Sequence, residues 1–219
     1  MIDNYCERLG PGLFAEPFNA ISNISFLLAA WFSWLLVKKA SSAGIGDYIL
    51  ILFIFSIGVG STLFHTFANS WSVWLDVIPI FLFQICMLWL YTRNVVKLSF
   101  TMTLTLIVMF IGASIVALQF PSMFNGSLMY APAAFVILLL GIFHACSQTA
   151  GRWLLMLAFV VFCISLFFRT VDDAICMEFP LGTHFIWHIL HGLVLYLATR
   201  ATITAHDKNC LARQIQSTP

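Results

Sequence analysis

Long runs of apolar residues, separated by short polar connections, dominate the chain. Seven such runs can be drawn, each about 20 residues long, which is the length of helix that crosses a hydrocarbon core of roughly 30 Å. Because the apolar residues are continuous rather than alternating with polar ones, the pattern indicates helices and not the strands of a membrane barrel. The expected spans are 17–37, 48–67, 72–92, 99–119, 130–148, 152–169 and 180–200.

The short connections predict that consecutive helices lie antiparallel and side by side. With no linker and no internal repeat, all 219 residues are expected to form one all-α transmembrane domain. The composition agrees, since 61% of the residues are hydrophobic and 9% are charged, against about 25% charged in soluble domains. A net charge of +1 without a basic cluster gives no indication of nucleic-acid binding.

The charged residues are distributed unevenly between the two ends of the predicted bundle. One end carries most of the basic residues, which are Lys38, Lys39, Arg93, Lys97, Arg152, Arg200, Lys208 and Arg213. The other end carries Arg8 and Arg169 together with the acids Asp3, Glu7, Glu16, Asp172, Asp173 and Glu178. Basic residues accumulate on the cytoplasmic side of membrane proteins. We therefore expect the N-terminus outside and the C-terminus in the cytoplasm.

Three histidines open the last apolar run. His184, His188 and His191 are spaced i, i+4 and i+7, so on a helix they share one face over two turns. Imidazoles inside a membrane are costly and normally face a polar interior that holds a partner. Two histidines at i and i+4 can also reach a single tetrahedral metal ion. The spacing therefore favours a metal site that needs at least one further ligand from elsewhere.

The second and third runs supply that ligand. His65 lies about one turn before the connection near residues 68–72, and Asp76 lies about one turn after it. In antiparallel neighbours the two residues come to nearly the same depth, just below the surface at which the last helix begins. His65, His184 and His188 are therefore predicted to bind one zinc ion, with the open fourth position that is typical of catalytic sites.

Other polar residues at this depth each have two interpretations. Asp76 is the only carboxylate in the seven runs, and either takes a proton from a water molecule or orients a liganding histidine. Ser61, one turn from His65 on the same face, either donates to an oxyanion or allows close helix packing. His191, a turn deeper, either lines a pocket or bonds between helices. His144 lies towards the opposite end and is not expected to join the site.

The first span contains a polar stripe formed by Asn19, Ser22 and Asn23, for which interhelical hydrogen bonding is a simpler explanation than ligand binding. The six cysteines show no CxxC spacing, so they are not expected to hold the metal. Four of them fall in or beside apolar runs, whereas Cys6 and Cys176 fall on the outer side.

The acids of the outer end are either solvated or ligands of a hard cation. Asp172 and Asp173 follow Arg169 in a predicted loop, where solvation suffices to explain them. The N-terminal segment is a candidate calcium site, because Ca²⁺ takes six to eight oxygen ligands that carboxylates and loop carbonyls supply.

Together these residues resemble the alkaline ceramidase family, a branch of a group of seven-helix membrane hydrolases that includes the adiponectin receptors. The resemblance covers nearly the whole chain. It is carried by Tyr5-Cys6-Glu7, Ala15-Glu16-Pro17-Phe18-Asn19 with Ser22-Asn23, Gly60-Ser61 with His65 and Asp76, Asp172 with Cys176, and His184 with His188.

The resemblance implies that His65, His184 and His188 bind zinc, with Asp76 and Ser61 beside the metal. It also implies hydrolysis of the amide bond of ceramide to a sphingoid base and a fatty acid.

In animal members of the family, a calcium ion is held by the acidic N-terminal segment, and a disulfide ties that segment to the loop before the last helix. By resemblance, Asp3, Glu7 and Glu16 are the calcium ligands here, and Cys6 pairs with Cys176. This chain differs in its shorter stretch from Cys6 to Glu16, and in Asn4, which stands where an acidic ligand is expected. The short chain and compact tail are more similar to a bacterial member, for which we expect the inner membrane and a site towards the outer face.

The sequence thus predicts a zinc-dependent intramembrane hydrolase of ceramide or a related N-acyl lipid. The alternative is a seven-helix receptor or sensor with a structural zinc ion. An ion or proton pathway is a weaker third hypothesis, because it requires ionisable residues at several depths and here they gather at one end.

Overall fold

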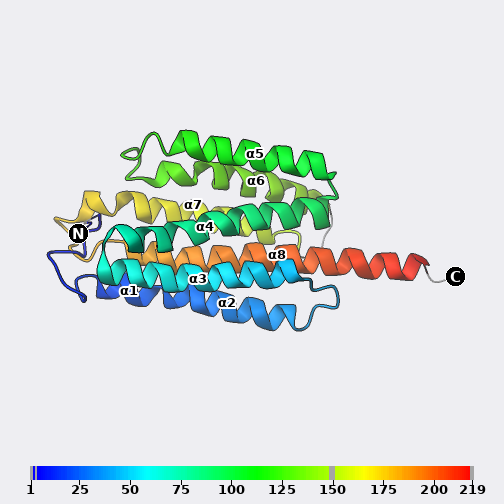
Figure 1. The fold of residues 1–219 in the computed structure, drawn as a ribbon, viewed down its shortest axis with the longest axis horizontal. Coiled ribbons are helices and arrows are strands. Elements are labelled where there is room, and N and C mark those ends of the chain that lie inside the picture. Colours follow the sequence, from blue (N-terminus) through cyan, green and yellow to red (C-terminus); the bar gives the residue numbers. More distant parts are fainter. Residues whose placement is uncertain (1, 3, 148–150, 218–219) are drawn as a thin grey trace.

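The computed structural model describes residues 2, 4–147 and 151–217, and this part of the chain contains helices and no strand (Figure 1). The helices are α1 (Pro17–Ser22), α2 (Ile24–Val37), α3 (Ile45–Phe67), α4 (Ser70–Tyr91), α5 (Phe100–Ala117), α6 (Ala131–Cys146), α7 (Leu154–Val171) and α8 (His184–Ser217). Three short helical turns accompany them: η1 (Thr92–Val96), η2 (Ser127–Tyr130) and η3 (Asp173–Ile175). Seven helical segments are long and apolar enough to cross a membrane, which confirms the predicted all-α bundle of seven spans.

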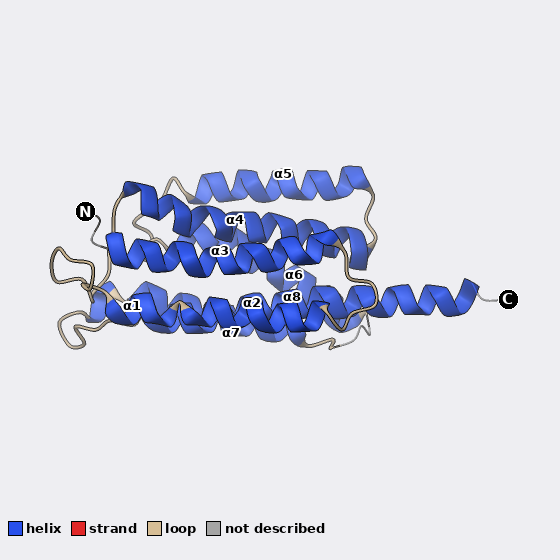
Figure 2. Cartoon of the chain, turned by 60° about the horizontal axis from the view of Figure 1, so that its bottom comes forward, coloured by secondary structure: helices blue, strands red, loops and turns tan. Residues whose placement is uncertain are grey.

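The spans lie side by side, with α8 at the centre. In its most apolar window 67% of the residues are buried within the protein, against 22% to 44% in the other spans. Figure 2 shows α3 and α4 along one side of the bundle and α2, α7 and α8 along the other. The N-terminus, the turn between α3 and α4 and the start of α8 all lie at one end, here called the site end.

Several helix ends differ by up to four residues from the predicted boundaries, and the last helix continues to Ser217 instead of ending at residue 200. The last helix begins at His184 and not near residue 180, because Gly182 adopts the left-handed region with φ of +67°. The first span is interrupted at Asn23, whose side chain donates to the carbonyl oxygen of Asn19 in the preceding turn. Pro17 at the first position of α1 is favourable there because its missing N–H needs no partner.

The helices that carry the site are joined by a close backbone contact between α3 and α4. A Cβ atom placed on Gly60 would lie 1.9 Å from the carbonyl oxygen of Leu75. That carbonyl has no donor one turn ahead, since residue 79 is a proline inside α4. Glycine at position 60 therefore allows the two helices to approach and holds Ser61 of α3 and Asp76 of α4 in one register.

Candidate metal centre

Three histidines meet at the site end, as the sequence predicts. His65 lies in the last turn of α3, while His184 and His188 occupy the first two turns of α8. Their candidate ligand atoms all lie within 4.8 Å of one another. The three side chains are at most 2% exposed. Such a group can hold a metal ion, and three imidazoles with an open position suit zinc.

Each of two histidines is fixed through the nitrogen that faces away from this centre. Nδ1 of His65 donates to the Glu16 carboxylate at 2.5 Å. Nδ1 of His188 lies 3.1 Å from the carbonyl oxygen of Asn19 and 2.7 Å from Oγ of Ser22. Partners of this kind set the tautomer of a metal-ligating imidazole. Within the polar stripe, Ser22 thus makes an interhelical hydrogen bond through its side chain and Asn19 through its carbonyl oxygen, and both bonds reach the site, whereas Asn23 bonds to Asn19 in the preceding turn.

The centre also contains buried ring nitrogens that need a partner. Nε2 of His65 and Nδ1 of His184 are buried and have no hydrogen-bond partner among the described residues. An unpaired buried polar atom is costly, and coordination of a cation satisfies an imidazole nitrogen equally well. The residues present therefore fit a metal ion.

Glu16 has a role that the sequence does not reveal. Besides His65, its carboxylate accepts from the side chains of Arg8 and Asn19. Burial acts to raise the pKa of Glu16, but the hydrogen bonds from His65, Arg8 and Asn19 outweigh it and hold the pKa below its usual value. An ionised Glu16 increases the basicity of the His65 imidazole and fixes the orientation of its ring.

A small cavity borders the histidines. Ser61 and Asp76 line it beside His184 and His188. Asp76 does not belong to the group of possible metal ligands in the described part of the chain. The structure therefore brings together the five residues that the sequence places at this depth, with Asp76 next to the histidines.

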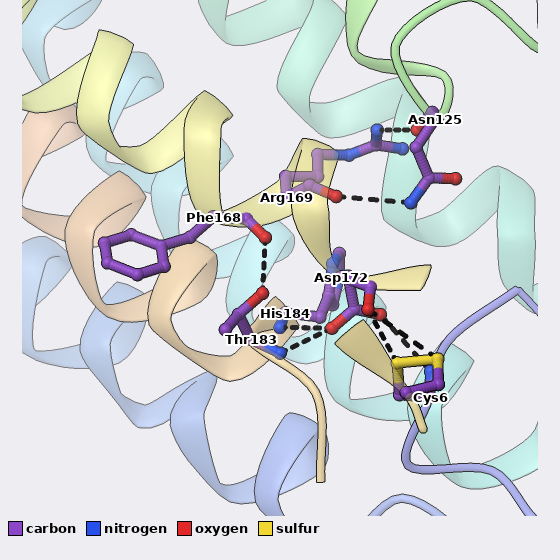
Figure 3. The surroundings of a disulfide bond; sticks show 8 residues. Cys6, Asn125, Phe168, Arg169, Asp172, Thr183 and His184 are labelled. Atoms are coloured by element: carbon purple, nitrogen blue, oxygen red, sulfur yellow. Dashed lines mark hydrogen bonds between the residues drawn. A yellow bond between two sulfur atoms is a disulfide. The ribbon is translucent and has the colours of Figure 1, made fainter. Parts of the chain in front are cut away.

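His184 is held from two sides. The ring of Tyr5 stacks on its imidazole with centroids 3.8 Å apart, and burial raises the pKa of the tyrosine hydroxyl well above its usual value. Asp172 accepts from the backbone N–H groups of Thr183 at 2.5 Å and of His184 at 2.9 Å, so it caps the start of α8 (Figure 3). Asp172 is 1% exposed, which corrects the interpretation of this residue as a solvated loop acid.

The implied disulfide is present. Cys6 is bonded to Cys176 across 170 positions of sequence, which ties the N-terminal segment to the loop before α8 (Figure 3). The backbone N–H of Cys6 donates to Asp172 at 3.2 Å. The crosslink thus fixes the segment that carries Tyr5, which stacks on His184, and Arg8, which pairs with Glu16.

The implied calcium site stays a prediction. Asp3 lies outside the described residues. The Glu7 carboxylate accepts from the backbone N–H groups of Phe18 at 2.6 Å and Asn19 at 2.8 Å, at the start of α1. Burial raises the pKa of Glu7, while these two hydrogen bonds oppose the increase. Glu16 is turned towards the histidine centre.

The deeper histidines have separate environments. His191 lines an apolar pocket with Phe83, Phe162 and Val194, and neither of its ring nitrogens has a partner among the described residues. This favours pocket lining over interhelical bonding. His144 hydrogen-bonds the hydroxyl of Tyr91 at 2.7 Å and takes no part in the centre, as expected.

The contact between Glu16 and His65 leads to a prediction. A Glu16→Gln protein is expected to bind zinc about 10- to 100-fold more weakly, because an uncharged amide orients His65 less firmly. Zinc affinity would be measured by competition with a chelator, and Glu178→Gln, at an exposed loop position, serves as control. Because Arg8 also loses its carboxylate, thermal stability is followed in the same samples. Unchanged affinity in folded Glu16→Gln protein would contradict the assigned role.

Comparison with protein-family models matches residues 4–214 to the family described as Ceramidase. Comparison with curated proteins finds no match. The matched range includes both ends of the disulfide and all three histidines of the centre.

Proposed function

Because the chain belongs to the ceramidase family, we propose that it is a zinc-dependent hydrolase that cleaves the amide bond of ceramide or a related N-acyl lipid. The observation that carries the proposal is the convergence of three buried histidines beside a cavity that also holds a carboxyl group. A structural zinc site is closed by four protein ligands, whereas a catalytic one keeps a position open.

His65, His184 and His188 would hold the zinc ion. Zinc bound at such a site supplies Lewis-acid activation of a water molecule and of a carbonyl group. Glu16, together with Ser22 and the Asn19 carbonyl, orients His65 and His188.

Asp76 is proposed to be the general base. Its carboxylate takes a proton from the attacking water and returns it to the nitrogen of the leaving long-chain base, which departs as an amine while the acyl carbon becomes a carboxylic acid. Ser61 lines the same cavity as Asp76, so it would place a hydroxyl donor near the carbonyl oxygen, where negative charge develops.

The surrounding cavities suit a lipid that enters from the membrane. An apolar cavity of about 290 Å³ lies between α4, α5 and η2, and it shares Ile80 and Tyr130 with the cavity beside the histidines. A chain passing this way reaches Asp76 without leaving an apolar environment. The pocket of His191, Phe83 and Val194 lies deeper and is available to an acyl chain.

The charge distribution supports a placement for this reaction. The site end carries most of the acids and the opposite end most of the basic residues, so the site is proposed to face the outer side of a bacterial inner membrane. An oxidising compartment at that side suits a disulfide.

The proposal is tested by metal removal and restoration. Protein purified in detergent is expected to contain about one zinc ion per chain and to release fatty acid from one or more members of a panel of N-acyl lipids. Chelation should abolish release, and added Zn²⁺ should restore it, whereas Mg²⁺ should not. Hydrolysis that persists in zinc-free protein would overturn the proposal. Stoichiometric zinc without hydrolysis of any lipid would support the structural-zinc sensor instead.

A further inference from the structure

A second and larger cavity opens at the site end. It measures about 650 Å³ and is formed by the N-terminal segment, the connection between α5 and η2, and the end of α7. Tyr5 and Arg169 line both this cavity and the smaller one that holds Asp76 and the histidines. The two cavities therefore adjoin at these two side chains, and a molecule bound at the histidines can extend into the outer cavity.

Arg169 is fixed in place at this junction. Its Nη1 donates to the carbonyl oxygen of Asn125 at 2.6 Å (Figure 3) and to Oγ of Ser127 at 3.1 Å. Its guanidinium lies over the rings of Tyr130 and Trp187, with 5.4 and 5.9 Å to the ring centroids. These contacts hold the plane of the guanidinium and use only one of its three nitrogens.

The remaining edge of Arg169 is available to a ligand. Within the described part of the chain, no residue accepts from its Nε or Nη2 and no carboxylate pairs with it. Arg8 also lines the outer cavity but is paired with Glu16, and Asp173 contributes a carboxylate to the lining. The charge at the junction is therefore a fixed guanidinium that makes no ion pair among the described residues, with the Asp76 carboxyl across the small cavity and Asp173 in the outer one as its acidic neighbours.

The backbone of Asn125 and Gly126 lies against the Nη1–Nη2 end of the guanidinium. Gly126 has a φ of +71°, a conformation that favours glycine, and a Cβ atom there would lie 3.4 Å from Nη2 of Arg169. The Nε–Nη2 edge is the one with which arginine binds phosphate or carboxylate through two parallel hydrogen bonds.

We propose that this junction binds the anionic head group of the lipid substrate, as a phosphate, sulfonate or carboxylate against the Nε–Nη2 edge of Arg169. The inference rests on the proposed amide hydrolysis and names its substrate class. With the amide at the histidines and the chains in the apolar cavities, the polar end of the lipid points into the outer cavity. The enzyme then prefers acidic N-acyl lipids to neutral ceramide.

The test compares two lipids that share one acyl chain and one long-chain base and differ in a neutral or a phosphorylated head group. Wild-type protein in an uncharged sugar detergent is expected to favour the phosphorylated lipid in kcat/KM. Arg169→Gln should reduce that preference on the order of 10- to 100-fold, the effect of one or two charge-assisted hydrogen bonds, with the loss mainly in KM. Arg169→Lys should restore part of it, since a lysine keeps the charge without the fork.

Arg152→Gln, two residues before the start of α7 at the opposite end of the bundle, is the matched control and should keep the preference. An equal loss of kcat/KM with both lipids in Arg169→Gln would overturn the proposal. Arg169 would then have only a structural role, through its contacts with Asn125 and Ser127.

Binding to zinc-stripped protein separates this inference from the proposed reaction. Wild-type protein should bind the phosphorylated lipid more tightly than the neutral one, whereas Arg169→Gln should show no such preference. If this preference in binding is found but the zinc-loaded protein hydrolyses neither lipid, the proposed hydrolysis is refuted and the head-group site is supported. If hydrolysis occurs with no preference in binding or turnover, the head-group site fails alone. Binding of inorganic phosphate at Arg169 without binding of the phosphorylated lipid would also overturn the assignment.

Discussion

An Asp76→Asn protein is expected to retain its zinc and to lose hydrolysis by about 10²- to 10⁴-fold, the usual contribution of a general acid or base. Asparagine preserves the size of the side chain, but it cannot take a proton. Asp76 does not lie within the group of candidate metal ligands among the described residues. Its replacement should therefore leave zinc content unchanged, which elemental analysis of the purified protein would measure beside the rate.

The same variant decides between the two roles that the sequence leaves open for Asp76. If Asp76 oriented a liganding histidine, the amide would weaken zinc binding by 10- to 100-fold. In the structure other residues orient the histidines, because Nδ1 of His65 faces Glu16 and Nδ1 of His188 faces Ser22. Asp207→Asn, at the opposite end of α8, is the control for a carboxylate removed away from the site. Full activity in Asp76→Asn would contradict the role of general base.

The arrangement of the three histidines could be predicted because it depends on local geometry. A helix period of 3.6 residues places His184 and His188 on one face. A short turn between α3 and α4 brings His65 and Asp76 to a common depth. Neither inference requires knowledge of how distant helices pack, and small errors in helix boundaries do not alter it. The start of α8 differs by four residues from the predicted boundary at 180, yet the histidines keep their spacing.

The partners of the histidines could not be predicted in the same way. Glu16 reaches His65 across 49 positions, and Ser22 reaches His188 across 166. Such contacts depend on the path of the N-terminal segment over the end of the bundle, and that path is set by the disulfide and by Asp172, which no periodicity reveals. From the sequence the acids near the N-terminus are therefore candidate calcium ligands, whereas in the structure Glu16 accepts a hydrogen bond from His65.

The contact between Gly60 and Leu75 is a further example of information that the sequence contains only in part. Pro79 inside a helix signals a freed carbonyl group four residues earlier, but the position of the helix that approaches it cannot be read from spacing. Once the two helices are placed, glycine is required at position 60 because any side chain would meet the Leu75 carbonyl. The register of Ser61 and Asp76 follows from this contact.

A His188→Ala protein is expected to lose zinc and hydrolysis together, with the rate falling to that of the zinc-free enzyme. Two imidazoles remain, and they do not provide the three protein ligands of a catalytic zinc site. Elemental analysis and fatty-acid release from the same preparation measure both effects. His65→Ala, on a different helix, should behave alike. A variant that merely unfolds would be recognised by its loss of thermal transition.

His191→Ala is the matched control for metal content, since His191 lies on the same face of α8 one turn deeper and is not a member of the three-histidine group. It should keep its zinc, whatever its effect on lipid binding. Loss of zinc in His191→Ala but not in His188→Ala would move the centre deeper into the bundle, away from Glu16 and Asp76. Hydrolysis retained by zinc-free His188→Ala protein would remove the metal from the reaction, and Asp76 would then have to act without it. Joint loss in His188→Ala and His65→Ala, with zinc kept in Asp76→Asn, would separate the residues that hold the metal from the residue that moves the proton.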